Sequence, residues 1–215
     1  MIFIGPRSSP HVRIAIPSGD FVGRRANVGD ESWFYHDDEE WAALAERLKL
    51  ISCPHCKATG TLIRHGFLRG FDDACPPRRT VRARRIFCSN RHRRPGCGRT
   101  FSVWIADKIR RRCTTTRRLW RFLQHAVAGS IADAVRATGS ALSDRTWQRL
   151  WNRFDRSQSA IRTALLARGP PVPPVPTGAA RRPVAAQVLA HLRAAFPHAD
   201  CPIAAYQQTM RSFFV

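Results

Sequence analysis

Four of the five cysteines between residues 53 and 97 restrict what this chain can fold into more than any other feature of its sequence. Cys53 and Cys56 form a CxxC pair, Cys88 follows after 31 residues, and Cys97 follows after eight more. A CxxC turn presents two thiolates from one tight loop, and zinc prefers four ligands in a tetrahedron. The spacing predicts a structural Zn²⁺ site formed by all four cysteines, with no position left open for catalysis.

The fourth ligand has a rival, because the gap before Cys97 is longer than the two residues usual in a second cysteine pair. His92 stands at an acceptable spacing from Cys88 and is the alternative ligand. The turn Pro95-Gly96 favours Cys97, since it can bring the chain back towards Cys88. The chain has seven cysteines and lacks a recognisable secretory signal, which is typical of metal ligation in a reducing compartment.

Positive charge is concentrated in the same part of the chain. The formal net charge is +21, and 33 of the 36 basic residues are arginines. Residues 53–168 contain 26 basic and six acidic side chains, whereas residues 1–52 have a net charge of −2. A field concentrated in one segment is typical of proteins that bind a polyanion. It predicts a nucleic acid as the partner, with a basic surface that serves only solubility as the alternative.

The composition changes along the chain and predicts an α+β protein in five parts. Residues 1–50 form an acidic amino-terminal segment with short strands and a helix that begins at Asp37 or Asp38. Residues 51–104 form a small zinc-ribbon β domain, and residues 105–168 form a helical domain that resembles a helix-turn-helix. A proline-rich linker at 169–183 leads to a short helical tail at 184–215.

The helical domain contains a pattern similar to a helix-turn-helix. Ser130 and Gly139 mark the ends of a short helix, and Ser143 begins a long one. The second helix of such a motif lies in the major groove, where Arg reads guanine and Asn or Gln reads adenine. The polar face of this helix predicts base contacts by Arg145, Gln148, Arg149 and Asn152, with a solvated face of a three-helix bundle as the alternative.

Other arginines lie in runs before the helix-turn-helix-like pattern and predict contacts with phosphate. Alternation along the strand expected at Val81–Phe87 would place Arg82 and Arg84 on one face. Phosphate contacts set affinity and register rather than sequence preference. The expected phosphate-binding residues are Arg82, Arg84, Arg85, Arg93, Arg94, Arg110 and Arg111.

The cysteine motifs resemble the amino-terminal zinc ribbons of bacterial insertion-sequence transposases. The matching segments are Cys53–Cys56, Arg85–Cys88 and Cys97–Phe101, within about 50 residues, and the long gap before Cys97 departs from the pattern. The resemblance implies a DNA-binding role, because a helix-turn-helix commonly follows such ribbons in these transposases. Their catalytic domain needs three carboxylates on a large mixed domain, for which the chain beyond residue 168 has no room.

These features predict a zinc-dependent DNA-binding protein rather than an enzyme, either a transposon-associated accessory protein or a transcriptional regulator. The alternatives are an RNA-binding zinc-ribbon protein and a metal-dependent nuclease, which would use His65, His92 or His125 with Asp72 or Asp73. The further partners that we consider are a second copy of the chain, in a homodimer, and a transposition-related protein. No apolar run approaches the roughly 20 residues that span a bilayer, so we expect a cytoplasmic, nucleoid-associated protein of a bacterium.

Overall fold

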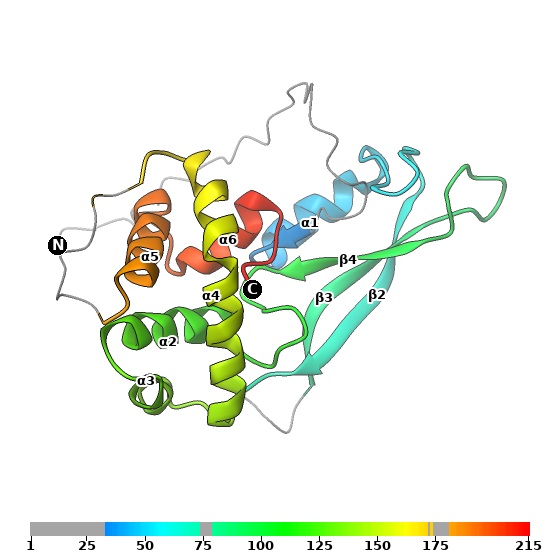
Figure 1. Cartoon of the computed structure of the whole chain (residues 1–215). Helices are drawn as coiled ribbons and strands as arrows, with labels where there is room; N and C mark the ends of the chain where they lie inside the picture. The colour runs from blue at the N-terminus through cyan, green and yellow to red at the C-terminus, as the bar shows by residue number, and fades with distance from the viewer. Residues whose placement is uncertain (1–32, 74–78, 172, 174–180) are drawn as a thin grey trace, which may run out of the picture.

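The computed structural model describes residues 33–73, 79–171, 173 and 181–215 (Figure 1). The strands expected before residue 30, Cys75 and most of the proline-rich linker lie outside these residues. The described chain has an α+β fold with a four-stranded mixed sheet in the order β1-β4-β3-β2. The strands are β1 (Trp33–Tyr35), β2 (Leu62–Phe71), β3 (Arg79–Cys88) and β4 (Thr100–Ile105).

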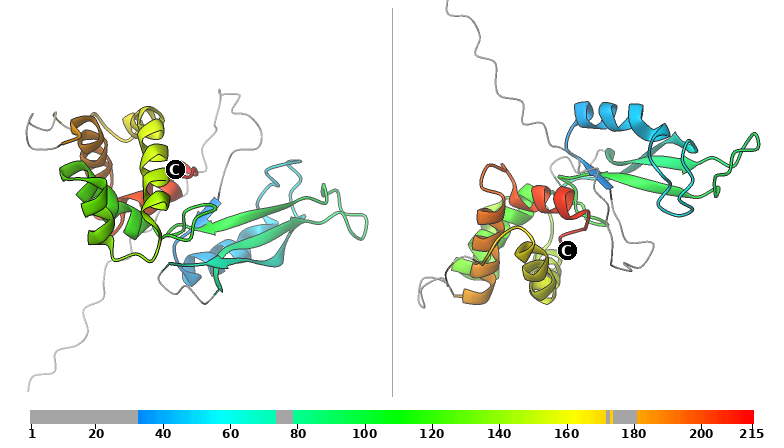
Figure 2. Two further views of the ribbon diagram at one scale, coloured as in Figure 1. Left: turned by 60° about the horizontal axis from the view of Figure 1, so that its bottom comes forward. Right: turned by 90° about the horizontal axis from the view of Figure 1, so that it is seen from above.

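The described part of the expected amino-terminal segment, residues 33–49, packs with this sheet instead of forming a separate unit. β1 pairs in parallel with β4 and places Trp33 opposite Val103. The helix α1 (Asp38–Glu46) continues into a 3₁₀ turn at Arg47–Lys49 and lies against one face of the sheet (Figure 2). Asp37 caps α1, as expected, by accepting a hydrogen bond from the backbone N–H of Glu40 at 2.8 Å. The sheet therefore crosses the boundary expected at residue 50.

One hydrophobic cluster joins α1, the sheet and the cysteines. Trp41 and Leu48 are buried against Ile86 and Val103, and Cys53 and Cys88 lie in the same cluster. Burial of apolar area stabilises such a core by about 25 cal/mol per Å². The cysteine region is consequently held by packing against α1 as well as by its own hydrogen bonds.

The other helices gather at one end of the sheet and share a second, larger cluster (Figures 1 and 2). They are α2 (Thr116–Ala128), α3 (Ile131–Thr138), α4 (Asp144–Leu166), α5 (Pro183–Ala195) and α6 (Pro202–Met210). Phe122 of α2 lies against Trp147 of α4, with ring centroids 4.6 Å apart. The residues expected to form a short tail complete this core, because Phe214 is buried and stacks on Phe154.

The expected helix ends in this part of the chain agree with the structure. Ser130 accepts a hydrogen bond from the backbone N–H of Asp133, and Gly139 ends α3 in the left-handed conformation with φ of +57°. Ser143 precedes α4, but its hydroxyl contacts the hydroxyl of Thr146 at 3.1 Å instead of a backbone N–H. Ser130 and Gly139 therefore fix where the short helix begins and ends.

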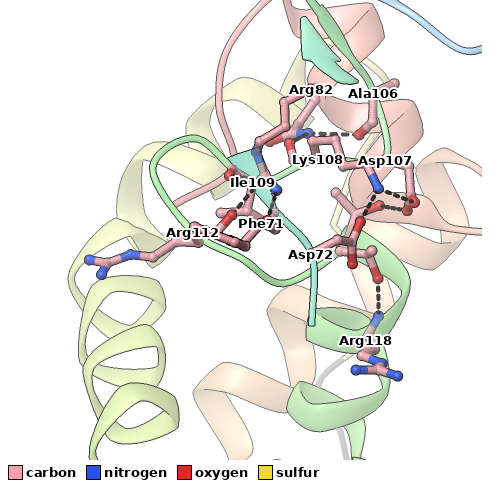
Figure 3. Close-up of polar contacts among 12 residues, drawn as sticks. Phe71, Asp72, Arg82, Ala106, Asp107, Lys108, Ile109, Arg112 and Arg118 are labelled. Carbon is pink, nitrogen blue, oxygen red and sulfur yellow. Dashed lines mark hydrogen bonds and ion pairs between the residues drawn. The ribbon is translucent and has the colours of Figure 1, made fainter. Parts of the chain in front are cut away.

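A buried polar network connects the sheet to the helices (Figure 3). Asp73, whose side chain is fully buried, forms an ion pair with Arg118 of α2 at 3.0 Å, and Asp72 pairs with Lys108. The Thr116 hydroxyl donates to Asp107 at 2.9 Å. Removing one partner of a buried ion pair costs about 3–5 kcal/mol. The network therefore holds α2 against the end of β2 and the segment after β4.

Candidate metal centre and nucleic-acid interface

The four cysteines expected to bind a metal lie together. Their sulfur atoms are all within 4.8 Å of one another. The Sγ atoms of Cys53 and Cys97 are 3.9 Å apart, and those of Cys56 and Cys88 are 3.7 Å apart. A tetrahedron with metal–sulfur bonds of about 2.3 Å has edges of about 3.8 Å. The cluster thus has the size that a tetrahedral thiolate site requires.

Two tight turns bring the sulfur atoms to this spacing. In the first turn the backbone N–H of Lys57 donates to the carbonyl of Cys53 at 2.9 Å, and Lys57 has a φ of +63°. In the second turn the N–H of Gly98 donates to the carbonyl of Cys88 at 3.0 Å. The N–H of Cys97 also points to the sulfur of Cys88 at 3.3 Å. Both cysteine segments are therefore fixed by their own backbones.

Gly96 lies where no larger residue fits without movement of the chain. A methyl group at this position would come within 2.1 Å of the backbone carbonyl oxygen of Ser89 and 3.0 Å of the Cys88 sulfur. The close approach lets the long loop between β3 and β4 return Cys97 to Cys88. This is the role expected of the Pro95-Gly96 turn.

The rival ligands lie elsewhere. His92 is exposed on the loop between β3 and β4, and the cluster does not include it. His55 stacks edge-on against Phe101, with ring centroids 6.2 Å apart. Across the part of the chain that the structure describes, the four cysteines are the only group of three or more His, Cys, Asp or Glu side chains close enough to hold a metal ion. The geometry favours Cys97 as the fourth ligand.

Protonation of the thiols follows their surroundings. Burial raises the pKa of the Cys53 thiol to about 12 and also raises the pKa of Cys97. The backbone N–H of Ala58 lowers the pKa of Cys56 to about 7. Because metal ligands must be thiolates, a cation that binds at neutral pH has to displace protons from Cys53 and Cys97. Affinity for the cation consequently rises with pH.

Arg82 is not available to phosphate, which corrects the expectation from strand alternation. Its side chain is buried, and its guanidinium donates to the carbonyl oxygens of Phe71 at 2.9 Å and Ile109 at 2.8 Å and to that of Arg112 (Figure 3). β3 has an extra residue at this point, opposite the step from Leu68 to Arg69. Arg82 therefore faces the segment after β4.

Arg84 is partly occupied by the acidic helix. Its guanidinium pairs with Asp38 and lies 4.9 Å from the centre of the Trp41 ring. The hydroxyl of Tyr35 accepts a hydrogen bond from it at 3.3 Å. Arg84 thus connects β3 to α1 and contributes less to a free basic surface than its sequence position suggests.

Most of the other expected contact residues are exposed in two separate places. The loop between β3 and β4 carries Arg93 and Arg94 at the end of the sheet far from helices α2–α6 (Figure 1). The exposed face of α4 carries Arg145, Gln148, Arg149 and Asn152, with Gln148 donating to Asn152 at 2.9 Å. The exposed expected residues outside these two places are Arg85, Arg110 and Arg111.

A basic surface forms where the segment after β4 meets α4. The pKa of Arg112 is lowered by burial and by the positive charges of Arg153 and Arg149. Figure 3 shows the Arg112 side chain directed towards α4. Arg110 and Arg111 are exposed on the same segment. We name the group Arg110, Arg111, Arg112, Arg149 and Arg153 the α4 basic surface.

One of these arginines, Arg153, was not among the predicted contact residues, whereas Arg112 belongs to the basic run with Arg110 and Arg111 that the sequence indicates as a phosphate contact. Arg153 could have been found from its position four residues after Arg149, which places both on neighbouring turns of one helix. The position of Arg112 beside α4 could not be predicted from the sequence, because it depends on how the chain returns after β4.

The residues of the nuclease alternative do not form a metal site. Asp72 and Asp73 are buried in ion pairs with Lys108 and Arg118. His92 lies on the exposed loop between β3 and β4, and His125 lies on the surface of α2.

No helix in the described ranges is long and apolar enough to cross a membrane.

No family model matches this chain, and searches of curated proteins and of solved structures return no match either. The similarity to transposase zinc ribbons consequently stays a prediction, carried by Cys53–Cys56, Arg85–Cys88 and Cys97–Phe101.

Proposed function

We propose that this protein binds double-stranded DNA and that a structural Zn²⁺ at the four cysteines holds its sheet in shape. α4 would enter the major groove, and the segment after β4 would contact the phosphates beside it. The protein would serve as a transcriptional regulator or as an accessory protein of a transposon.

The donor set supports zinc as the metal. Four thiolates in a tetrahedron suit Zn²⁺, which has no preference for another geometry. Cys53 and Cys88 are buried, whereas Cys56 is exposed and Cys97 is partly exposed, so the site is anchored in the core on one side and faces solvent on the other. Since four protein ligands leave no place for a reactive water, the role of the metal is structural.

The α4 basic surface is the observation that carries the DNA proposal. The Arg112 side chain is directed towards α4, the helix that carries Arg149 and Arg153, and burial together with the positive charges of Arg153 and Arg149 lowers its pKa (Figure 3). Such self-repulsion is unfavourable until a polyanion neutralises it. The short α3, the turn after Gly139 and the exposed start of α4 suit a helix that presents Arg145 and Arg149 to base edges.

The close approach at Gly96 gives a test of the metal site. Gly96→Ala should weaken Zn²⁺ binding about 10- to 100-fold, because the methyl group displaces the backbone between Cys88 and Cys97. Competition with a chelator of known affinity measures the change. Gly129→Ala is the matched control, since its methyl group would lie 3.6 Å from the carbonyl oxygen of His125, an ordinary contact. Equal zinc affinity in both variants would contradict the assigned geometry.

Salt dependence tests the DNA interface. If about six arginines neutralise phosphates, affinity for a duplex should fall about 1,000-fold or more between about 50 and 200 mM salt. Fluorescence anisotropy with a labelled 20-base-pair duplex measures the slope on the zinc-loaded protein. A slope near zero, or no binding at low salt, would overturn the proposal.

A further inference from the structure

The outer strand of the sheet exposes two phenylalanines. Phe67 and Phe71 are 50% and 51% exposed, and β2 is the end strand in the described order (Figure 1). Side chains alternate between the faces of a strand, so Phe67, Arg69 and Phe71 share one face. An exposed aromatic pair on an edge strand is a liability for a soluble protein unless a ligand uses it.

Arginines accompany both rings. Arg84 and Arg69 lie 5.3 Å and 5.9 Å from the centre of Phe67, and Arg79 lies 5.7 Å from the centre of Phe71. β2 and β3 together contain six arginines and no acidic residue. We name Phe67, Arg69, Phe71, Arg79 and Arg84 the aromatic–arginine patch. Its chemistry combines flat apolar faces with positive charge.

The composition of the aromatic–arginine patch selects among possible ligands. A stable protein interface buries about 800 Å² per partner and has few charges at its centre, whereas two half-exposed phenylalanines offer only about 200 Å². A duplex keeps its base faces stacked inside. A phenyl ring has no hydrogen-bonding group and can recognise a base only through that face, which is free only in an unpaired strand.

We propose that the aromatic–arginine patch binds unpaired DNA, with bases stacked on Phe67 and Phe71 and the backbone held by Arg69 and Arg79. The two rings lie four residues apart along the strand, a distance of about 13 Å, so they contact two different bases. This inference rests on the proposed function in that it assumes a DNA partner. It adds a second binding site, for DNA that is locally opened. This site lies on β2, the edge strand at the other side of the sheet from β1.

The test compares single-stranded and duplex DNA on the full-length, zinc-loaded protein. Fluorescence anisotropy with a labelled 20-nucleotide strand, alone and annealed to its complement, gives both affinities. Phe67→Ala/Phe71→Ala should weaken single-strand binding about 10- to 100-fold while duplex affinity changes less than twofold. Phe67→Tyr/Phe71→Tyr keeps both ring faces and should bind the single strand like the native chain.

Val184→Ala is the control for loss of an exposed apolar side chain, since Val184 is 55% exposed at the start of α5. Thermal unfolding and zinc content check that the double alanine variant is folded. If it is not, Arg69→Ala takes its place, and this variant is expected to weaken binding to the single strand but not to the duplex. Single-strand affinity unchanged by the alanine pair would overturn the inference and leave the duplex proposal intact. Loss of single-strand binding in a protein that does not bind duplex at all would support the inference and reject the proposed function.

Discussion

Cys53→Ser is expected to abolish stoichiometric zinc binding and to unfold the region around the cysteines. Native mass spectrometry should show one zinc per native chain and none per variant chain. The free energy of structural zinc binding is about 10–16 kcal/mol, and a site with three thiolates loses much of it. Cys53 also lies in the hydrophobic cluster with Trp41 and Leu48, so loosening this segment exposes part of that core.

Cys113→Ser provides the matched control for this experiment. Cys113 lies outside the cluster, and its carbonyl, which accepts a hydrogen bond from the N–H of Asp73 at 2.9 Å, is unchanged by the substitution. The control should keep its zinc and its melting temperature within a few degrees. A Cys53→Ser protein that retains one zinc per chain would reject the assigned ligand set.

Arg149→Ala is expected to weaken binding to the preferred duplex by about 10- to 100-fold and to broaden the range of sequences bound. A bidentate contact between arginine and guanine contributes about 1–3 kcal/mol of discrimination. Arg149 is exposed on α4, the helix towards which Arg112 is directed, so its side chain can reach a base edge beside the phosphate contacts. Measuring the affinity for the preferred site and for a scrambled duplex separates the two effects.

Arg111→Ala is the comparison for that variant. Arg111 is exposed on the segment after β4. Loss of its contact with phosphate should weaken binding to the preferred duplex and to the scrambled duplex equally. Arg117→Ala, which removes an exposed arginine already paired with Asp200, should change neither affinity by more than about twofold. If Arg149→Ala, like Arg111→Ala, reduces the affinity for the preferred duplex and for the scrambled duplex by the same factor, α4 does not read sequence.

Features set by neighbouring residues could be predicted from the sequence. The two cysteine turns follow from the residues around Cys53 and Cys97, because each turn has its own backbone hydrogen bonds, whereas the pairing of β2 with β3 brings the two turns together. The ends of α3 follow from Ser130 and Gly139, whose side chain and conformational freedom act within one helical turn. Local chemistry of this kind does not depend on the rest of the fold.

Features set by distant pairing could not be predicted. β1 joins the sheet through contacts between residues about 70 positions apart, and a three-residue strand has no pattern that names its partner. Gln207 donates to the carbonyl oxygen of Ala106 at 2.8 Å, a contact that ties α6 to the end of β4. Only the folded chain shows that the expected tail is part of the helical core.

Arg82 illustrates why a regular pattern failed at one residue. Strand alternation places Arg82 and Arg84 on one face, but the extra residue in β3 breaks the alternation between them. Arg82 then satisfies three backbone carbonyls at the junction, while Arg84 meets α1. The loop carbonyls that receive Arg82 come from residues 27 and 30 positions later, which no local pattern indicates.

Selection of bound duplexes from a random DNA pool by the zinc-loaded protein tests the central proposal most directly. The α4 basic surface predicts enrichment of a short shared sequence that contains guanine or adenine. These bases would be contacted by the side chains exposed on the same helix, which are Arg145, Gln148, Arg149 and Asn152. Structured RNA added in excess should not displace the enriched duplex. A pool that shows no enrichment after repeated rounds, or a protein that RNA removes from DNA, would contradict the proposal.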